Sequence, residues 1–424
     1  MGLVDQSYQR RREEIYAPMR QEGIFTWDSM YNQEYALASI YPISESFRAE
    51  IAGATEKLGK IFTRTIRVIQ QGPDELLNEL GIPEAARLAV RLTANPDIPT
   101  VVGRFDFART PRGLKMLEFN SDTPTGVVEA FYVNGNVCRF YGWQDPNDGM
   151  NEHIFAAFQD IIGRYKKMGF SADAVYFSSL DWHEEDAGTT RYLMRESGLH
   201  ARYIPLSSLA VKGDRLYFRD REQGSYQPVD VLYRLHALEI LAEETDDDGY
   251  PTGAHLLDLV ANKKLALINP PDAFIAQTKA LQALIWNLHE TNAFFTLEEH
   301  EWIDTYMLPT YLENPFLGKT AYVRKPIFGR EGGAVTLYDA SGETMARDQQ
   351  SLYWDQPMVY QQLAELETVE TDTLRGRFHG RLLWGSFLIG GKASAIMARI
   401  DRKITGNLSY FLPVGIGDRK GELR

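Results

Sequence analysis

The sequence predicts a mixed α/β protein, with α+β features, and three observations support this prediction. Residues 5–97 carry the spacing of amphipathic helices, residues 101–120 alternate like an antiparallel hairpin, and residues 174–205 have a strand–helix–strand pattern. A strand–helix–strand unit is typical of a parallel sheet, whereas a tight hairpin is antiparallel. Because 424 residues exceed one typical core, we expect subdomains that share a cleft.

The N-terminal region is predicted to be helical. Charged and apolar side chains recur at helical spacing, and Ser44 before Glu45 has the pattern of an N-cap. The expected helices span residues 5–22, 32–40, 44–67 and 82–92.

Residues 101–120 have the pattern of an antiparallel hairpin. Two alternating runs flank a Pro/Gly turn at residues 110–113, which is the usual hairpin signal. Successive side chains of a strand point to opposite faces, so each strand has one mostly polar and one apolar face. The side chains expected together on the polar face are Arg104, Asp106, Met116, Glu118 and Asn120.

Three oxygen donors beside a cation suit a magnesium site. Mg²⁺ takes one or two carboxylates and completes its shell with waters and phosphates, which fits Asp106, Glu118 and Asn120 if Asp106 pairs with Glu118. Arg104 is placed to neutralise charge on a transferred phosphoryl group. The alternative is a surface sheet with cross-strand ion pairs, and a register slip of one residue would separate the donors.

Composition and charge exclude several classes of protein. A net charge of −13 argues against nucleic-acid binding, so an anion must be held by a local cluster of basic residues. The single cysteine, Cys138, forms no intrachain disulfide and excludes a cysteine-rich zinc site. Without a signal-peptide pattern or a membrane-spanning apolar run, the expected location is the cytoplasm.

Two polar loops are candidates for binding a substrate. The loop over residues 120–126 offers Asp122, Thr123 and Thr125, which either cap a helix or hold a substrate carboxylate. The acidic loop over residues 181–190 follows a buried strand, and ligands of open α/β sheets bind at such carboxyl ends. Two acids in it, Glu184 and Glu185, are therefore candidates for a cationic amine, unless they only favour the start of a helix.

Basic residues and glycines later in the chain suggest a phosphate site. Lys279 lies in a predicted apolar helix over residues 274–288, where it either extends to the surface or meets a phosphate. Residues 320–338 have a strand, glycine-rich loop, strand pattern. Its glycines let backbone N–H groups approach phosphates, although a plain hairpin turn is the alternative. The residues proposed for phosphate contact in this segment are Lys325, Arg330, Gly332 and Gly333.

The C-terminal strands add amides and an arginine. Residues 358–363 form a predicted strand that ends in Gln361 and Gln362, whose amides suit an adenine edge. Residues 378–390 are predicted to form strands closed by a glycine pair. Arg399 lies in the next strand, where an ion pair with Asp401 is the structural alternative to a functional role.

Several motifs occur in an order that resembles a known family. R-F-D-F, L-K-M-L-E-F-N-S-D-T-P-T, K-P-I-F-G-R-E-G-G and the block over residues 395–413 resemble the glutathionylspermidine synthase family, a branch of the ATP-grasp ligases. The resemblance implies a permuted ATP-grasp fold with a pre-ATP-grasp-like parallel subdomain. It also implies an ATP- and Mg²⁺-dependent reaction, in which a carboxylate becomes an acyl phosphate that an amine attacks.

The resemblance also implies residue roles and a division of the chain. Arg104 and Arg399 would be catalytic, Asp106, Glu118 and Asn120 would bind magnesium, Thr123 and Thr125 would lie near the acid, and Glu184 and Glu185 near the amine. The implied nucleotide contacts are Lys279, Lys325, Arg330, Gly332, Gly333, Gln361, Gln362 and Thr405. The sequence departs from the family pattern at Thr278 and Ala334. We expect a helical region over 1–97, the hairpin with a substrate subdomain over 98–260, and a nucleotide-binding region over 261–424.

The expected partners are a small-molecule or short-peptide carboxylate and a cationic amine such as a polyamine. Bifunctional members of the family carry an N-terminal cysteine amidase of about two hundred residues, and we expect that activity to be absent here because the chain has no room for it. The sequence is also compatible with a homodimer. Two other functions are compatible with parts of this pattern. A non-catalytic nucleotide-binding module would have lost an oxygen ligand or the arginine, and a metal-dependent hydrolase using Asp106 and Glu118 would not need the loop that carries Lys325 and Arg330.

Overall fold

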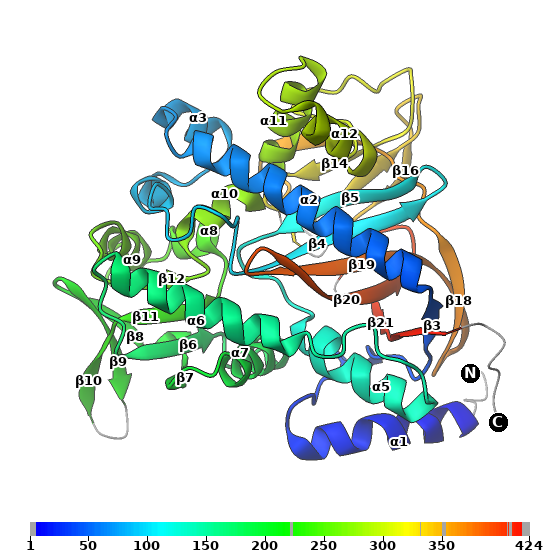
Figure 1. The fold of residues 1–424 in the computed structure, drawn as a ribbon, viewed down its shortest axis with the longest axis horizontal. Helices are drawn as coiled ribbons and strands as arrows, with labels where there is room; N and C mark the ends of the chain where they lie inside the picture. Colours follow the sequence, from blue (N-terminus) through cyan, green and yellow to red (C-terminus); the bar gives the residue numbers. More distant parts are fainter. Residues whose placement is uncertain are drawn as a thin grey trace.

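The computed structural model describes residues 6–220, 224–330, 332–349, 353–404, 406 and 409–417. Several sheets and their covering helices make up the mixed α/β architecture that the sequence predicts (Figure 1). Among the described residues, no helix is long and apolar enough to cross a membrane.

The N-terminal region is helical, with short strands between its helices. Its elements are α1 (Gln6–Glu22), β1 (Ser29–Met30), β2 (Gln33–Glu34), β3 (Tyr41–Ile43), α2 (Glu45–Ile69), α3 (Asp74–Glu79), the 3₁₀ turn η1 (Glu84–Ala86) and α4 (Arg87–Val90). The expected cap of α2 is confirmed, because the Ser44 side chain accepts a hydrogen bond from the Phe47 backbone N–H at 3.1 Å.

The helix expected over residues 32–40 is wrong. Tyr31 and Asn32 adopt left-handed backbone conformations and turn β1 tightly into β2. Further along, the Leu37 backbone N–H donates to the Phe411 carbonyl at 3.0 Å. Tertiary pairing therefore takes the backbone groups that a helix would have used.

The middle of the chain contains the hairpin and a parallel sheet. Its elements are β4 (Val102–Thr110), β5 (Gly113–Asn120), the π-helix η2 (Glu129–Val133), α5 (Asn134–Tyr141), α6 (Asn151–Lys167), β6 (Val175–Ser179), α7 (Glu184–Glu196), β7 (Ala201–Pro205), η3 (Leu206–Ser208), β8 (Leu209–Lys212), β9 (Arg215–Asp220), β10 (Ser225–Val229), β11 (Val231–Leu235), α8 (Leu238–Leu241) and α9 (Thr252–Ala261). The predicted strand–helix–strand unit is confirmed, since β6 pairs in parallel with β7 in the sheet β12-β11-β6-β7.

The C-terminal part completes two sheets that surround the site. Its elements are β12 (Ala266–Ile268), η4 (Pro271–Ala273), α10 (Phe274–Gln277), α11 (Lys279–Glu290), α12 (Leu297–Tyr306), β13 (Thr310–Tyr311), β14 (Tyr322–Pro326), β15 (Thr336–Tyr338), β16 (Thr344–Arg347), β17 (Met358–Gln362), β18 (Thr368–Thr373), β19 (Gly376–Ile389), β20 (Lys392–Asp401), β21 (Tyr410–Leu412) and β22 (Val414–Ile416). Strands β13 to β17 form a five-stranded sheet, while β18 to β21 join the hairpin β4–β5 in a six-stranded sheet.

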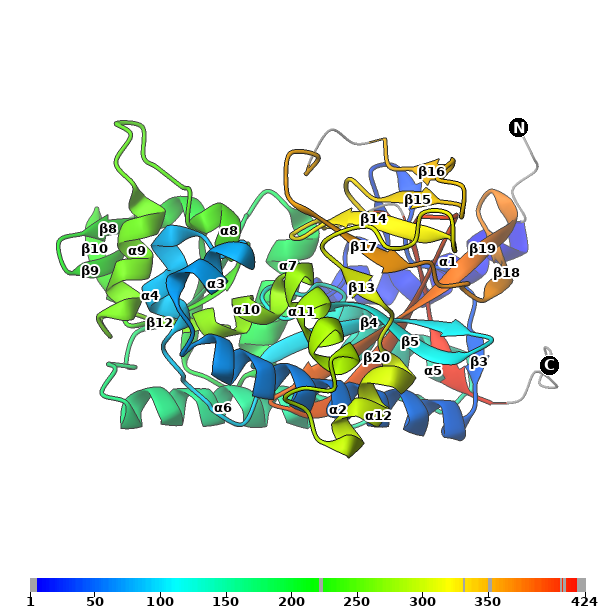
Figure 2. The same ribbon diagram turned by 90° about the horizontal axis from the view of Figure 1, so that it is seen from above.

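The sheets do not follow the expected sequence segments. The parallel sheet lies on the left in both ribbon views, and the five-stranded sheet and the hairpin strands β4 and β5 lie to the right of it (Figures 1 and 2). The hairpin shares its sheet with β19 and β20, whereas β12 joins the parallel sheet. The expected division at residues 97 and 260 therefore stays a prediction, and it does not coincide with the sheets.

One face of the six-stranded sheet is covered by α2, which leaves the other face for chemistry. Phe62 of α2 packs against Phe105 and Phe119 of the hairpin, with ring centroids 5.7 and 5.1 Å apart. These rings belong to a continuous apolar core. The hairpin side chains that alternate with these rings face away from α2.

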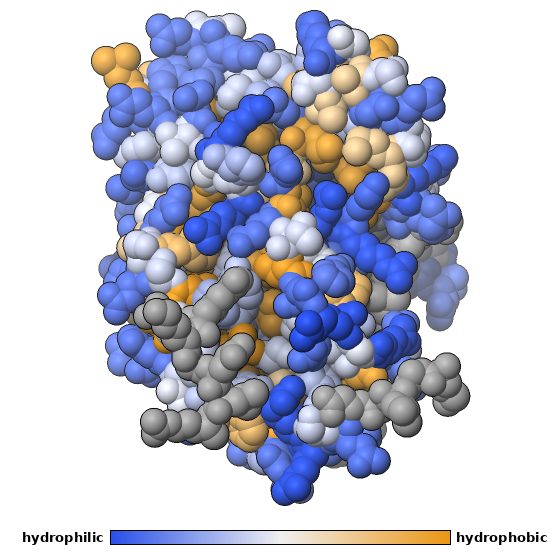
Figure 3. Space-filling model, turned by 90° about the vertical axis from the view of Figure 1, so that its right-hand side faces the viewer, coloured by the Kyte–Doolittle hydropathy of each residue, from blue (hydrophilic) through white to orange (hydrophobic). Residues whose placement is uncertain are grey.

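On the face shown in Figure 3, hydrophilic side chains predominate and hydrophobic ones gather in patches between them.

Candidate active site

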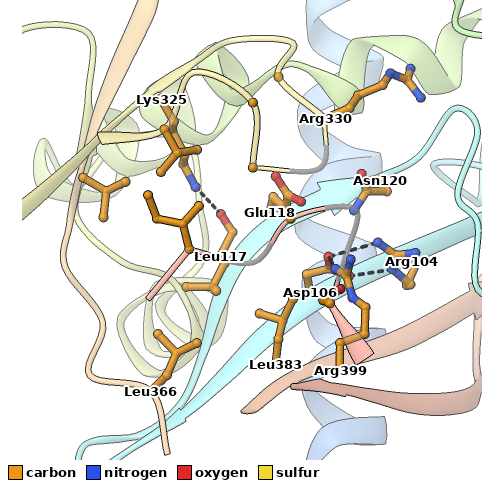
Figure 4. A pocket seen from close by; sticks show the side chains of 18 of the residues that line it. Arg104, Asp106, Leu117, Glu118, Asn120, Lys325, Arg330, Leu366, Leu383 and Arg399 are labelled. Carbon is orange, nitrogen blue, oxygen red and sulfur yellow. Dashed lines mark hydrogen bonds and ion pairs between the residues drawn. The ribbon is translucent and has the colours of Figure 1, made fainter. Parts of the chain in front are cut away.

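A cavity of about 240 Å³ lies at the polar face of the hairpin (Figure 4). Its walls come from the hairpin, from the first residue of α11, and from the five- and six-stranded sheets. Most of the residues predicted from sequence line it: Arg104, Asp106, Glu118, Asn120, Thr123, Thr125, Glu185, Lys279, Lys325, Arg330, Gly332, Gly333, Gln361, Gln362 and Arg399. Thr405 lies outside the described residues.

The predicted pairing of the hairpin is confirmed where it matters for the site. Arg104 lies opposite Asn120 and Asp106 lies opposite Glu118. The position expected for Met116 is wrong, because a β-bulge follows and Met116 is fully buried opposite Phe107. The residue that lines the cavity instead is Leu117. An extra residue in one strand reverses the alternation beyond it, so the face changes at the bulge.

At one end of the cavity, two arginines bind one carboxylate. Arg104 donates to Asp106 from Nε at 2.6 Å and from Nη2 at 3.0 Å, and the Arg399 Nη2 donates to the same carboxylate at 2.8 Å. Burial opposes charge on Arg104, but Asp106 more than offsets it and raises the pKa of the guanidinium. We call these three residues the arginine end. Asp401, the partner expected for Arg399 in a structural role, instead accepts from backbone N–H groups.

At the other end, two lysines lie near one carboxylate, and one of them pairs with it. The Lys279 Nζ lies 3.2 Å from Glu118 Oε2, and the Lys325 Nζ donates to the Leu117 carbonyl at 2.8 Å and to Gln361 Oε1 at 2.9 Å. Burial lowers the pKa of Lys325 to about 7, although Glu118 opposes that shift. Burial would raise the pKa of Glu118, but the charges of Lys279, Lys325 and Arg104 lower it to about 2. We call Glu118, Lys279 and Lys325 the lysine end.

The position of Lys279 differs from the sequence-based expectation. The expected single helix over residues 274–288 is broken at Thr278, whose side chain accepts a hydrogen bond from the Ala280 N–H and caps α11. Lys279 is therefore the first residue of the mostly apolar helix α11 and does not lie in the middle of a longer helix. Its ammonium also donates to the Gly329 carbonyl at 3.0 Å, so it neither extends to the surface nor lacks a partner.

The oxygen donors fit a divalent cation in part. Among the described residues, no group of three or more His, Cys, Asp or Glu is placed to hold a metal ion. A metal would therefore use the two carboxylates of the hairpin together with Asn120. The amide nitrogen of Asn120 is buried without a hydrogen-bond partner in the described structure, and buried polar groups normally have one. A ligand that engages this amide would satisfy it.

The glycine-rich loop contacts the loop over residues 120–126, which we call the substrate loop. Arg330 donates from Nη1 to Thr123 Oγ1 at 2.7 Å and forms an ion pair with Glu239 of α8 at 3.3 Å. Glu239 and Asp122 raise the pKa of Arg330, against the effect of burial. Gly332 adopts a φ of 72°, which favours glycine. Its loop thus connects to the opposite wall by a side chain and does more than join two strands.

Gln361 lines the cavity as expected, and its side chain is also bonded within the protein. Its amide oxygen accepts from Lys325, and its amide nitrogen donates to Thr310 Oγ1 at 3.0 Å. Both polar atoms are thus used within the protein, and the side chain positions Lys325. Gln362 lines the cavity beside it.

The assignment of Asp122 to a substrate is not supported. Asp122 is almost fully buried, and its two oxygens accept from Arg234 at 2.6 and 3.1 Å and from the Leu238 N–H at 3.0 Å. It therefore holds the substrate loop against the parallel sheet. Its neighbours Thr123 and Thr125 line the cavity as expected.

The acidic pair divides into an outer and an inner residue. Both begin α7, as their helix-favouring composition predicts. The carboxylate of Glu184 accepts a hydrogen bond from Thr26 and is not among the cavity residues, whereas Glu185 lines the cavity. Sequence reasoning missed a further wall residue, Tyr35, because it falls in the helix that was wrongly expected.

Comparison with known proteins gives this site its context. The family described as "Glutathionylspermidine synthase preATP-grasp" matches residues 6–417. The chain belongs to the glutathionylspermidine synthase family. The predicted family and the predicted enzyme class, an acid–amine (C–N) ligase, are thereby confirmed.

Two relatives of this glutathionylspermidine synthase family member share about a quarter of its residues over the matched segments. An inferred acid–amine ligase of Haemophilus influenzae is 26% identical over 334 residues, which cover 74% of each chain. The bifunctional glutathionylspermidine synthetase/amidase of Escherichia coli is 24% identical over 81% of this chain, and the match spans only 56% of that protein. The chain thus spans about half of the bifunctional relative.

The predicted fold is also confirmed by a solved structure. The glutathione synthetase-like effector GSS30 of Globodera pallida, in its apo form, matches 98% of this chain and 99% of its own with a TM-score of 0.59. At 13% identity, this likeness concerns the fold alone.

Proposed function

We propose that this member of the family is an ATP- and Mg²⁺-dependent ligase that joins a small-molecule or short-peptide carboxylate to a cationic amine through an acyl phosphate. The observation that supports it most is that Lys279 and Lys325, from separate segments, line the same cavity as the arginine end, where Lys279 pairs with Glu118 and the charge of Lys325 acts on that carboxylate. Excess positive charge in a buried cavity suits a polyanion such as the ATP phosphates.

The residues around the lysine end would bind the nucleotide and its metal. Lys279, Lys325 and the glycine-rich loop would hold the phosphates. Glu118 and Asn120, with Asp106, would hold Mg²⁺, which supplies further neutralisation of phosphate charge. The positions of Asp106, Glu118 and Asn120 in the cavity wall support this assignment, and the unpartnered amide nitrogen of Asn120 could donate to a phosphate oxygen. Asp106 would share its oxygens with the arginines that already bind it.

The arginine end would act on the transferred phosphoryl group. The forked hydrogen bonds from Arg104 to Asp106 hold the guanidinium in one orientation, and Arg399 is fixed by the same carboxylate. Fixed positive charge that need not reorganise lowers the free energy of the phosphoryl-transfer transition state. Thr123 and Thr125 would bind the acid, and Glu185 the amine.

The proposal is tested by substrate-dependent ADP release. We expect ADP to form from ATP and MgCl₂ only when glutathione or a short peptide and an amine such as spermidine are both present, with the amide detected by mass spectrometry. A non-catalytic nucleotide-binding module would bind ATP without ADP release. A hydrolase would act without ATP, and either result would overturn the proposal.

A further inference from the structure

A buried carboxyl group lies behind the cavity wall, and the proposed mechanism does not use it. Glu129 is fully buried in the π-helix η2, three residues after Gly126 of the cavity wall. Its Oε1 accepts hydrogen bonds from the Trp27 Nε1 at 2.8 Å and from the Tyr35 hydroxyl at 3.1 Å. The other oxygen, Oε2, is buried without a hydrogen-bond partner in the described part of the chain. π-Helical turns are frequent at functional sites.

Tyr35 connects this carboxyl to the cavity. Its side chain lines the cavity together with Glu185, while its hydroxyl donates away from the cavity to Glu129. The Trp27 ring holds α7 in place, because a Cβ on Gly188 of that helix would lie 2.1 Å from the ring. The helix that carries Glu185 is thus packed against the same tryptophan that binds Glu129.

The charges around Glu129 leave it able to take up a proton. Burial raises its pKa, whereas the hydrogen bonds from Trp27 and Tyr35 and the charge of Arg104 oppose that rise. Burial raises the pKa of Tyr35 well above its ordinary value. The charges of Glu129 and Glu185 raise it further, whereas the charge of Arg399 lowers it. Tyr35 therefore stays neutral and can pass a proton on only by receiving another.

We propose that Glu129 is the acceptor of the proton that the substrate ammonium must lose before it attacks, and that Tyr35 relays this proton. This inference rests on the proposed ligase function. The ammonium between Glu185 and Tyr35 gives one proton to the tyrosine oxygen as the tyrosine gives its own to the Glu129 carboxylate. The freed amine forms the C–N bond, the acyl C–O bond breaks, and the second nitrogen proton leaves with the phosphate. The proton on Glu129 returns to solvent after product release.

Hydroxylamine provides a test, because it is neutral near pH 7.5 and needs no such acceptor. With ATP, MgCl₂ and glutathione, Glu129→Gln and Tyr35→Phe should lower kcat for spermidine about 100-fold, within the usual range for general acid–base catalysis. Both should form the hydroxamate at close to the wild-type rate. KM for spermidine should stay similar in both variants, whereas Glu185→Gln should raise it.

Asp145→Asn is a matched control. Asp145 is a partly buried carboxyl whose pKa is also raised by burial, and it contacts Asn134 rather than the cavity. This control should keep the wild-type ratio of amide to hydroxamate formation. Tyr35→Phe keeps the ring, so it carries the test even if Glu129→Gln does not fold.

Two results would overturn the relay. One is an equal loss of amide and hydroxamate formation in the Tyr35 variant, which would show a structural role. The other is a wild-type rate with spermidine in both variants. If the wild-type protein forms neither product from ATP and glutathione, the ligase function itself fails, and this outcome is distinct from both.

Discussion

The two ends of the cavity hold their carboxylates in different ways. At the arginine end, Asp106 receives three charged hydrogen bonds from two guanidinium groups. At the lysine end, Glu118 pairs with the Lys279 ammonium and is also affected by the charge of Lys325, whose pKa burial lowers to about 7. At the arginine end, forked hydrogen bonds fix the orientation of Arg104 on Asp106, whereas at the lysine end burial opposes the charge of Lys325, so an incoming anion would stabilise it. This difference suggests that the lysine end binds phosphates and the arginine end positions fixed charge for the reaction.

The largest effect is expected from breaking the arginine end. Arg104→Lys keeps the charge but loses the fork that fixes its orientation. We expect kcat to fall about 100- to 1,000-fold, as for other fixed charge-stabilising groups, while the Kd for ATP changes little. The Kd is measured by titration calorimetry and kcat by ADP release.

A surface arginine on the same sheet provides the matched control. Arg377 of β19 pairs with Glu370 at 2.9 Å but is mostly exposed, so Arg377→Lys should leave both constants near wild type. A large rise in the Kd for ATP in Arg104→Lys with kcat preserved would reverse the roles of the two ends.

The next effect is on nucleotide affinity at the lysine end. Lys325→Met removes a buried charge whose hydrogen bonds to phosphate are worth about 1.5 to 3 kcal/mol, so ATP should bind about ten- to a hundredfold more weakly. The exposed Lys319 gives the control Lys319→Met, which should bind ATP normally. Unchanged ATP affinity in Lys325→Met would show that the phosphates do not bind at the lysine end.

The lysine end should also take up a proton when ATP binds. Lys325 is largely neutral above pH 7 in the free protein, and phosphate charge should raise its pKa toward the ordinary value of about 10.4. ATP affinity should therefore fall as pH rises above 7. Calorimetry at pH 8.5 in two buffers of different ionisation enthalpy should show uptake approaching one proton. Lys325→Arg, which does not titrate there, should show none, and equal uptake in both proteins would contradict this assignment.

The smallest effect concerns stability in acid. The pKa of Glu118 is lowered from 4.5 to about 2 in the folded protein. Its contribution to stability is therefore complete above pH 4.5 and is lost as pH falls toward 2. Urea unfolding of Glu118→Gln between pH 5 and pH 3 should show a weaker loss of stability with acidification than wild type. Identical slopes would mean that Glu118 is not paired in the folded protein.

The sequence predicted the hairpin well because its pairing follows from alternation and a turn. Both rules are local, so Arg104, Asp106, Glu118 and Asn120 were placed correctly. The bulge after Met116 was not predictable, because it depends on how the strand packs against its neighbours.

Long-range partners account for most of the other differences. Asp122 pairs with Arg234, which lies 112 residues away, and Arg399 pairs with Asp106, which lies 293 residues away. No local pattern encodes such partners. Glu129 did give a signal, since it is an acid within the apolar run over residues 127–133, but only the fold shows that Tyr35 links it to the cavity.

The transfer of oxygen from the acid to phosphate tests the central claim most directly. If the carboxylate of the acid attacks ATP to form an acyl phosphate, one carboxylate oxygen must leave with the phosphate when the amine attacks. With glutathione labelled with ¹⁸O in both oxygens of its glycine carboxylate, and with spermidine, we predict one ¹⁸O atom in each inorganic phosphate released, measured by mass spectrometry. Amide formation that releases unlabelled phosphate would contradict the acyl-phosphate mechanism and the roles assigned to both ends of the cavity.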